Sequence, residues 1–207
     1  QEDIELFRPI FIENLKRFKD EQIIKILCGV RRCGKSTILK SYKNELLSLG
    51  VKEQNIIERL YTSVEFDSDF DYRKMYHELM VLIENAEKNQ KIYLLLDEVQ
   101  EVENWEKCVN SLFENQNVDI YVTGSNSKLL SSEISTYLTG RFVQIPIFTL
   151  SFSEFIDFKS HYFPKNSDNS LDFYFDLYLK IGGFPFLAKT NHSQDENYQI
   201  VEGIFST

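Results

Sequence analysis

Short apolar runs alternate with longer amphipathic segments along this chain. Three runs are almost wholly apolar, as in strands buried on both faces of a parallel sheet, at residues 23–28, 92–96 and 118–122. Two further strands are predicted at 56–66 and 142–147. Apolar residues recur near a helical spacing between the strands, at 37–49, 72–88, 105–114 and through Ile134 and Leu138. The pattern predicts an α/β fold with a five-stranded, doubly wound parallel sheet flanked by helices.

The two ends of the chain carry helical patterns outside this alternation. Residues 3–19 place apolar residues at helical spacing, so we expect a helix packed beside the core. Near the other end, Ser193 to Glu196 forms a capping box that opens a last helix. We therefore expect an N-terminal helix at 1–20, a core at 21–150 and a truncated helical lid at 151–207.

The most specific motif lies between the first predicted strand and its helix, at Gly29 to Ser36. It reads Gly, four residues, Gly-Lys-Ser, which is the pattern of a phosphate-binding loop. Two glycines allow a tight turn whose N–H groups surround a phosphate, and the helix N-terminus faces the same anion. Lys35 is expected to reach the β- and γ-phosphate oxygens, and the Ser36 hydroxyl to be a magnesium ligand.

The predicted nucleotide-binding residues are those of the loop and the helix start: Gly29, Arg31, Arg32, Cys33, Gly34, Lys35, Ser36 and Thr37. The alternative is a chance match, which four fixed positions give in about one chain in a hundred of this size. For Cys33 we consider a reactive thiol, because nearby cations and a helix N-terminus favour a thiolate. The alternative is a small residue that fits the loop.

The run at 92–96 ends abruptly in two carboxylates, Asp97 and Glu98. Asp97 is expected to bind Mg²⁺ together with Ser36, and Glu98 to orient and polarise the attacking water. The alternative is a strand that emerges into solvent at an acidic turn. The next strand ends in Thr-Gly-Ser-Asn, where Ser125 first, and Asn126 second, are candidates to sense the γ-phosphate or the water; a polar turn cap is the alternative.

Composition narrows the classes of protein. The net charge of −9 argues against binding of DNA through a broad electrostatic surface. Hydrophobic residues make up 43% of the chain, which suffices for a core. Three scattered cysteines give no disulfide framework, which favours a reducing compartment. No apolar run reaches 18 residues. We expect a cytoplasmic protein that does not bind membranes.

Six motifs in one order carry a family resemblance: Gly-x4-Gly-Lys-Ser, Leu-Leu-Asp-Glu-Val-Gln, Thr-Gly-Ser-Asn-Ser, Gly-Arg-Phe, Ser-Phe-Ser-Glu-Phe and Gly-Gly-Phe-Pro. Over nearly its whole length the chain resembles AAA+ P-loop ATPases. More narrowly, it is similar to prokaryotic ATPases that carry a C-terminal domain of unknown function, whose phosphate loops read Gly-x-Arg-Arg-x-Gly-Lys-Ser. The resemblance implies the sheet order 5-1-4-3-2 and a small helical lid.

The resemblance also bears on assembly and partners. Arg141 matches by position an arginine that often reaches a neighbouring subunit's γ-phosphate, and a structural ion pair in its own subunit is the alternative. The resembled proteins are about twice as long, so the part that binds a protein or nucleic-acid partner is expected to be absent here. If Arg141 reaches the γ-phosphate of a neighbouring subunit, we expect a homo-oligomer joined through Arg141.

The predicted function is magnesium-dependent hydrolysis of ATP to ADP and phosphate, coupled to an unknown partner. A GTPase would need an Asn-Lys-x-Asp guanine reader, which the sequence lacks, and a helicase would need two such domains. A small-molecule kinase would not explain Glu98. The serious alternative is a nucleotide-dependent switch with little or no turnover.

Overall fold

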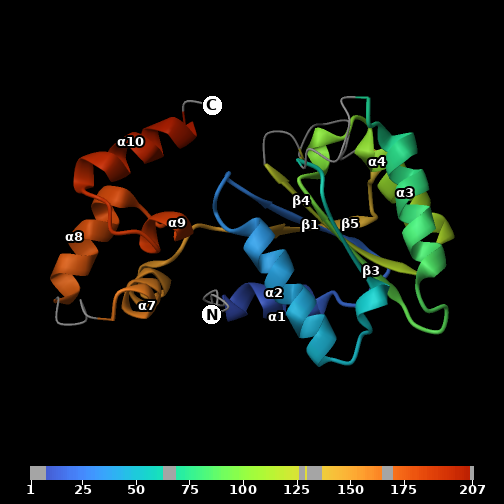
Figure 1. The fold of residues 1–207 in the computed structure, drawn as a ribbon, viewed down its shortest axis with the longest axis horizontal. Helices are drawn as coiled ribbons and strands as arrows, with labels where there is room; N and C mark the ends of the chain where they lie inside the picture. Colours follow the sequence, from blue (N-terminus) through green and yellow to red (C-terminus); the bar gives the residue numbers. More distant parts are fainter. Residues whose placement is uncertain (1–7, 63–68, 126–128, 130–136, 165–169, 206–207) are drawn as a thin grey trace. The chain divides into compact units, whose positions relative to one another are not determined.

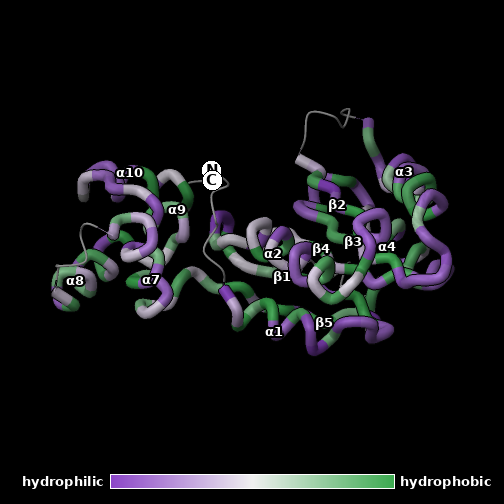
Figure 2. The backbone as a smooth tube through the Cα atoms, turned by 60° about the horizontal axis from the view of Figure 1, so that its bottom comes forward, coloured by the Kyte–Doolittle hydropathy of each residue, from purple (hydrophilic) through white to green (hydrophobic). Residues whose placement is uncertain are grey.

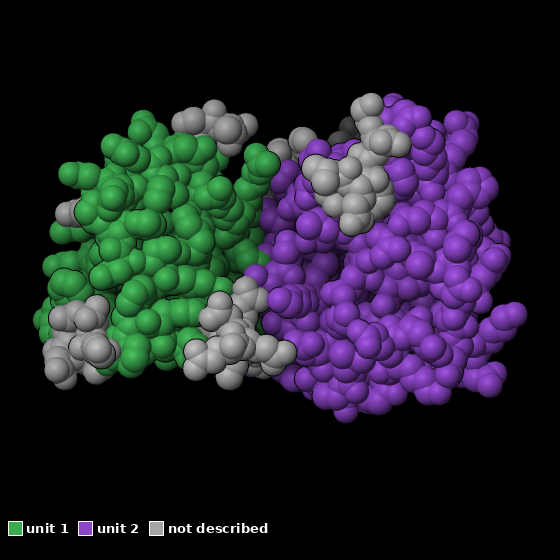
Figure 3. Space-filling model, viewed as in Figure 1, with its two compact units in different colours: residues 1–8, 30–34, 147–207 green, residues 9–29, 35–146 purple. Residues whose placement is uncertain are grey.

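A computed structural model describes residues 8–62, 69–125, 129, 137–164 and 170–205. The chain divides into two compact units (Figure 3). Unit 1 comprises residues 1–8, 30–34 and 147–207, and unit 2 comprises residues 9–29 and 35–146. Each unit is described by itself below. The three-part domain division expected from the sequence stays a prediction.

Unit 2 is built on a five-stranded parallel sheet. Its strands are β1 (Ile24–Gly29), β2 (Ile56–Leu60), β3 (Ile92–Asp97), β4 (Val118–Ser125) and β5 (Phe142–Pro146). Their order is β2-β3-β4-β1-β5, and every pairing is parallel. This is the predicted order 5-1-4-3-2 in reverse, so the predicted fold class is confirmed. The second strand ends earlier than predicted, at Leu60.

Helices cover both faces of the sheet: α1 (Pro9–Arg17), α2 (Lys35–Ser48), α3 (Tyr72–Asn85) and α4 (Trp105–Asn115). Side chains alternate along a strand, so β4 sends Ile120 and Val122 into the core shared with α3 and α4. Tyr121 points to the opposite face, where its hydroxyl meets that of Tyr42 on α2 at 2.8 Å. Figure 1 shows α3 and α4 together on one side of the sheet. Figure 2 shows the mixture of hydrophilic and hydrophobic residues along the helices.

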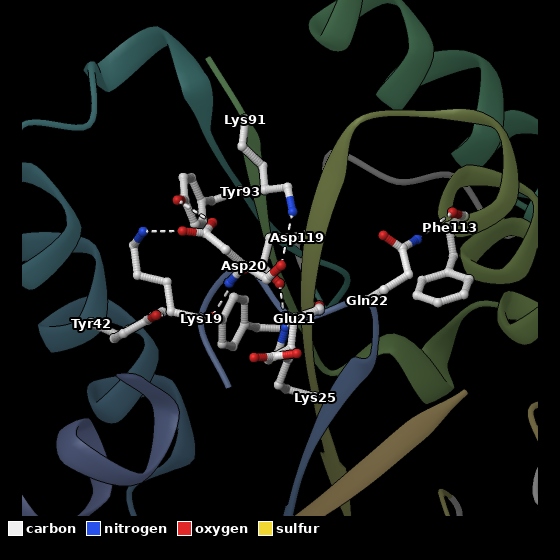
Figure 4. A network of polar contacts seen from close by, with 11 residues as sticks. Lys19, Asp20, Glu21, Gln22, Lys25, Tyr42, Lys91, Tyr93, Phe113 and Asp119 are labelled. Atoms are coloured by element: carbon white, nitrogen blue, oxygen red, sulfur yellow. Dashed lines mark hydrogen bonds and ion pairs between the residues drawn. The ribbon is translucent and has the colours of Figure 1, made fainter. Parts of the chain in front are cut away.

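A buried ion pair marks the amino-terminal edge of the sheet (Figure 4). Lys25 of β1 donates to Asp119 of β4, and both side chains are fully buried. Burial lowers the pKa of Lys25, and the Asp119 carboxylate opposes that shift. Tyr121 Oη also donates to Asp119 at 3.1 Å, which completes the pairing of the buried charge. Because a buried unpaired charge is costly, the pair favours this register of β1 against β4.

The described residues of unit 1 form the helices α7 (Phe152–Tyr162), α8 (Leu171–Ile181), α9 (Pro185–Ala188) and α10 (Gln194–Phe205). Its core is formed by Leu150, Phe155, Phe158, Tyr174, Ile181, Phe184, Leu187 and Ala188. The predicted capping box at α10 is confirmed, since Ser193 N–H donates to Glu196 Oε2 at 2.7 Å and Glu196 N–H returns to Ser193 Oγ. Gly183 lies in a turn before α9, where its carbonyl accepts from Leu150 N–H at 2.6 Å.

Candidate nucleotide site

The carboxyl-terminal edge of the sheet brings the predicted residues of unit 2 together. Gly29, at the end of β1, pairs with Ser125 of β4. On the other side of β4, Leu96 pairs with Val122, so that Asp97 follows beside Thr123. Neighbouring strands lie about 4.8 Å apart, so β1 and β3, which carry Gly29 and Asp97, are about 10 Å apart on the two sides of β4. Ligands of open parallel sheets bind outside this edge.

Lys35 and Ser36 begin helix α2. The Lys35 side chain is buried, and its Nζ donates to the carbonyl of Gly29 at 2.9 Å. The first turn of α2 contains no acidic residue, Ser36 is exposed and Thr37 is half-buried. The helix N-terminus therefore offers backbone N–H groups, one ammonium and two hydroxyls to an anion, without a competing carboxylate in that turn.

Residues 30–34 of the loop belong to unit 1. Arg32 has a φ of 62° and Gly34 a φ of 101°, the left-handed region in which glycine carries no steric penalty. Arg31 and Arg32 are both exposed. The Arg32 guanidinium lies over the ring of Phe186, 5.1 Å from its centroid. The loop residues thus pack against the segment that carries α9.

Arg8 also holds this loop within unit 1. Its buried guanidinium forms a two-pronged pair with Glu154, through Nε to Oε1 at 2.8 Å and Nη2 to Oε2 at 3.1 Å. It also donates to the carbonyls of Cys33 at 3.3 Å and Phe148 at 2.8 Å. Burial raises the pKa of Glu154, but the hydrogen bonds from Arg8 and Ser151 and the charge of Arg8 together hold that pKa below its ordinary value. One arginine therefore ties the loop to the start of α7.

The structure argues against the reactive-thiol hypothesis for Cys33. Its side chain is fully buried, with 0% exposure, so alkylating reagents have no access to the sulfur in this state. Cys28 and Cys108 are buried too, and burial raises the pKa of both, to about 12 for Cys108. Cys33 fits the alternative, a small residue that fills the loop.

Asp97 and Glu98 are fixed by a residue that the sequence interpretation did not select. Thr123 of β4 is fully buried, and its hydroxyl donates to Asp97 Oδ1. The same Oγ1 accepts from the backbone N–H of Glu98 at 3.0 Å. The register of β3 against β4 places Thr123 beside the first carboxylate, and the sequence pattern does not provide that register.

The Glu98 backbone is left-handed, with a φ of 55° and a ψ of 44°. Such a conformation is uncommon for a residue with a side chain and costs about 1 to 3 kcal/mol. It comes directly after β3, where the chain turns into the short 3₁₀ helix η2 (Val99–Glu101). The Glu98 side chain is half-buried and accepts from Gln100 Nε2.

The two sensing candidates have different outcomes. Ser125 is half-buried and pairs with Gly29, so it lies beside the start of the phosphate loop. Asn126 lies outside the described residues.

Arg141 lies at the opposite edge of the sheet from these residues. It directly precedes β5, and its carbonyl accepts from Ile24 N–H at 2.7 Å, at the start of β1. β1 is six residues long, so its two ends are about 17 Å apart. The guanidinium pairs with Glu114 of α4 at 2.7 Å and also donates to Asn110. The structure thus shows the ion pair of the alternative interpretation, and Arg141 is remote from Lys35 of its own chain.

The donor set at the carboxyl edge fits Mg²⁺ held together with a nucleotide. Mg²⁺ is commonly bound by one or two protein oxygens together with substrate phosphates and water. Asp97 supplies a carboxylate that Thr123 orients, and Ser36 supplies an exposed hydroxyl. Across the described residues, no group of three His, Cys, Asp or Glu side chains is placed to form an all-protein metal cage.

The fold and the loop together define a P-loop nucleotide-binding module of the AAA type. The model of an AAA domain family matches residues 21–156, and the chain belongs to that family. A Haemophilus influenzae protein described as uncharacterized is 37% identical over 203 residues, which cover 97% of this chain and 48% of that protein. An uncharacterized protein of Methanocaldococcus jannaschii is 30% identical over 228 residues, with the same two shares. The chain spans about half the length of these relatives.

Solved structures support the fold. DnaA from Aquifex aeolicus bound to AMPPCP matches with a TM-score of 0.55 at 14% identity, over 93% of this chain and 59% of that one. Hsp104 of Saccharomyces cerevisiae, in complex with casein, matches with a TM-score of 0.56 at 17% identity, over 95% and 36% of the two chains. In the part of the chain that the structure describes, no helix is both long and apolar enough to cross a membrane.

Proposed function

We propose that this AAA module binds ATP with Mg²⁺ and hydrolyses it to ADP and phosphate. The observation that carries the proposal is the pair of carboxylates, Asp97 and Glu98, at the carboxyl edge of the sheet, where Thr123 binds the Asp97 carboxylate and the backbone N–H of Glu98. These carboxylates lie at the same edge of the sheet as the phosphate-binding loop, with one strand between them, which supports a role in nucleotide chemistry. The nucleotide-bound state of DnaA supports the same use of the fold.

Each residue has a role that follows from its chemistry. Lys35 and the N-terminus of α2 bind phosphate oxygens, and Gly34 supplies a loop backbone free of a Cβ. The loop residues Arg31 and Arg32 and the hydroxyl of Thr37 are additional candidates for nucleotide contacts. Ser36 and Asp97 would hold Mg²⁺, which supplies charge neutralisation on the phosphates when it is bound.

Glu98 is the proposed general base. Its carboxylate takes a proton from water while the water oxygen bonds to the γ-phosphorus and the bond to the β-phosphate oxygen breaks. Ser125, next to Gly29, is the proposed sensor of the γ-phosphate, and Asn126 the second candidate. The rival function, a switch without turnover, gives Glu98 no task.

The remaining parts of the proposal concern the whole protein. The relatives are about twice as long as this chain, and we propose that the additional part binds the protein or nucleic-acid partner. Three free cysteines agree with a cytoplasmic location, which we include in the proposal. Arg141 is proposed to act on a neighbouring subunit in a homo-oligomer, because it is too distant to act in its own.

Two variants test nucleotide binding by calorimetry. Lys35→Ala should abolish binding of magnesium-ATP, and Asp97→Asn should remove the magnesium dependence of tight binding. Lys40→Ala, an exposed lysine on the same helix, is the matched control and should bind like the parent. Unchanged magnesium-ATP affinity in both test variants would refute the proposed site.

A further inference from the structure

Gln100 occupies an unusual position next to the proposed base. Its Nε2 donates to Glu98 Oε2, and a second, longer contact of 3.4 Å reaches the exposed Glu101. Its other polar atom, Oε1, is buried and has no hydrogen-bond partner among the described residues. Among the described residues, the amide is therefore held by the hydrogen bonds of its Nε2 and by the packing around its oxygen.

Gly124, which has no side chain, leaves the space that the Gln100 amide occupies. A Cβ on Gly124 would lie 2.2 Å from Gln100 Oε1 and 2.6 Å from Leu129 Cγ. The carbonyl end of Gln100 thus fills the space that any larger residue at 124 would take. Gly124 lies between Thr123 and Ser125, so this space is at the carboxyl end of β4, where the other residues of the site also lie.

We infer that Gln100 is a positioning residue for the proposed hydrolysis, and that it acts through Glu98. The inference rests on the proposed function. The amide oxygen packs against Gly124. This packing orients the amide so that its N–H donates to the Glu98 carboxylate. Thr123 fixes the backbone of Glu98 from the other side, through its N–H. Gln100 therefore restricts the side chain that must meet the water, and Thr123 restricts the backbone that carries it.

Such restriction matters because a base contributes only when it is correctly placed. A misplacement of about 1 Å can cost about 100-fold in rate, even when binding is unaffected. Free rotation of the Glu98 side chain would let the carboxylate turn toward solvent. Gln100 touches neither the Lys35 ammonium nor the Asp97 carboxylate through any hydrogen bond that the structure shows, so its removal should spare nucleotide affinity.

The test is steady-state ATP hydrolysis by Gln100→Ala and Gln100→Glu. Gln100→Ala should lower kcat about 10- to 100-fold with an unchanged KM. Gln100→Glu keeps the shape but loses the donor and faces a like charge, so its loss should be at least as large. Glu101→Gln alters the other acceptor of the same amide and should leave kcat unchanged.

A double variant separates positioning from a general structural role. If Gln100 acts through Glu98, then Gln100→Ala should add no further loss in the Glu98→Gln background. Three results would each overturn the inference: a kcat of the double variant that falls by the product of the two single losses, a rise in kcat for Gln100→Ala, or a change confined to KM. If Glu98→Gln itself hydrolyses ATP like the parent, the proposed base is wrong, which is a different failure.

Discussion

Thr123 shows how one hydroxyl can organise two functional groups. As a donor it orients Asp97, and as an acceptor it fixes the backbone of Glu98 in a left-handed conformation. The bond to Asp97 is buried and the bond to Glu98 is partly buried, so each is worth more than a contact in water. The proposed Mg²⁺ ligand and the proposed general base therefore share one support.

Replacement of that hydroxyl should affect both stability and binding. Thr123→Val keeps the shape but leaves Asp97 and the Glu98 N–H without their partner, so unfolding should become easier by about 1 to 3 kcal/mol. Magnesium-ATP affinity should fall as well, which calorimetry measures. Thr123→Ser retains the hydroxyl and is the matched control. Parent-like binding and stability in Thr123→Val would show that the hydroxyl is dispensable.

At this scale the sequence predicted some residues and missed others for physical reasons. An apolar run that ends in two carboxylates indicates Asp97 and Glu98 without any structure. The role of Thr123 depends on the register between two strands, which periodicity does not provide. The contact of Gln100 depends on the left-handed backbone at Glu98, since that conformation sets where the following turn directs its side chains.

At the scale of elements, the loop segment 30–34 belongs to the helical unit rather than to the sheet. Arg8 is one contact that holds it there, because it joins the Cys33 carbonyl to Glu154 in the capping box of α7. No sequence pattern indicated this, since Arg8 and Glu154 are 146 residues apart. Cys33 is buried in this packing, which agrees with the small residue that the sequence analysis gave as the alternative to a reactive thiol.

The Arg8–Glu154 pair should make stability depend on pH. The pKa of Glu154 is lowered in the folded state, so the stabilisation is fully present above about pH 4.5 and is lost as the pH falls through the folded value. We expect Glu154→Gln to lower the free energy of unfolding by about 1 to 3 kcal/mol at pH 7, less at pH 3 to 4.

Denaturant titrations across this pH range measure the difference. Asp157→Asn, at an exposed position of the same helix, is the control and should show little difference at any pH. A loss for Glu154→Gln that stays constant down to pH 3 would contradict the assignment.

At the scale of the whole molecule, periodicity predicted the five-stranded parallel sheet, whereas the order of its strands followed from the family resemblance. Strand order depends on long-range pairing, and apolar runs do not encode their neighbours. The buried Lys25–Asp119 pair is one physical element that helps to select it, because each charge needs the other strand. The proposed role of Arg141 depends on whether the protein forms a homo-oligomer.

Arg141 can be tested between subunits. If it acts in trans, Arg141→Ala should bind ATP normally and lose hydrolysis by about 10³-fold or more. A mixture with Glu98→Gln should then recover activity, because one type of mixed interface is intact. Glu114→Gln breaks the ion pair but keeps the arginine, and it should remain active. The absence of rescue, with a monomeric protein at assay concentration, would leave only the structural ion pair.

The central claim is that this chain hydrolyses ATP with Glu98 as the base. The most direct measurement is phosphate release, together with ATP binding, by the parent and by Glu98→Gln. Glu98→Gln keeps the shape of the side chain, so binding should survive while turnover falls by about 10²- to 10⁴-fold. Equal turnover in the two proteins, or no phosphate release by a parent that binds ATP tightly, would contradict the claim.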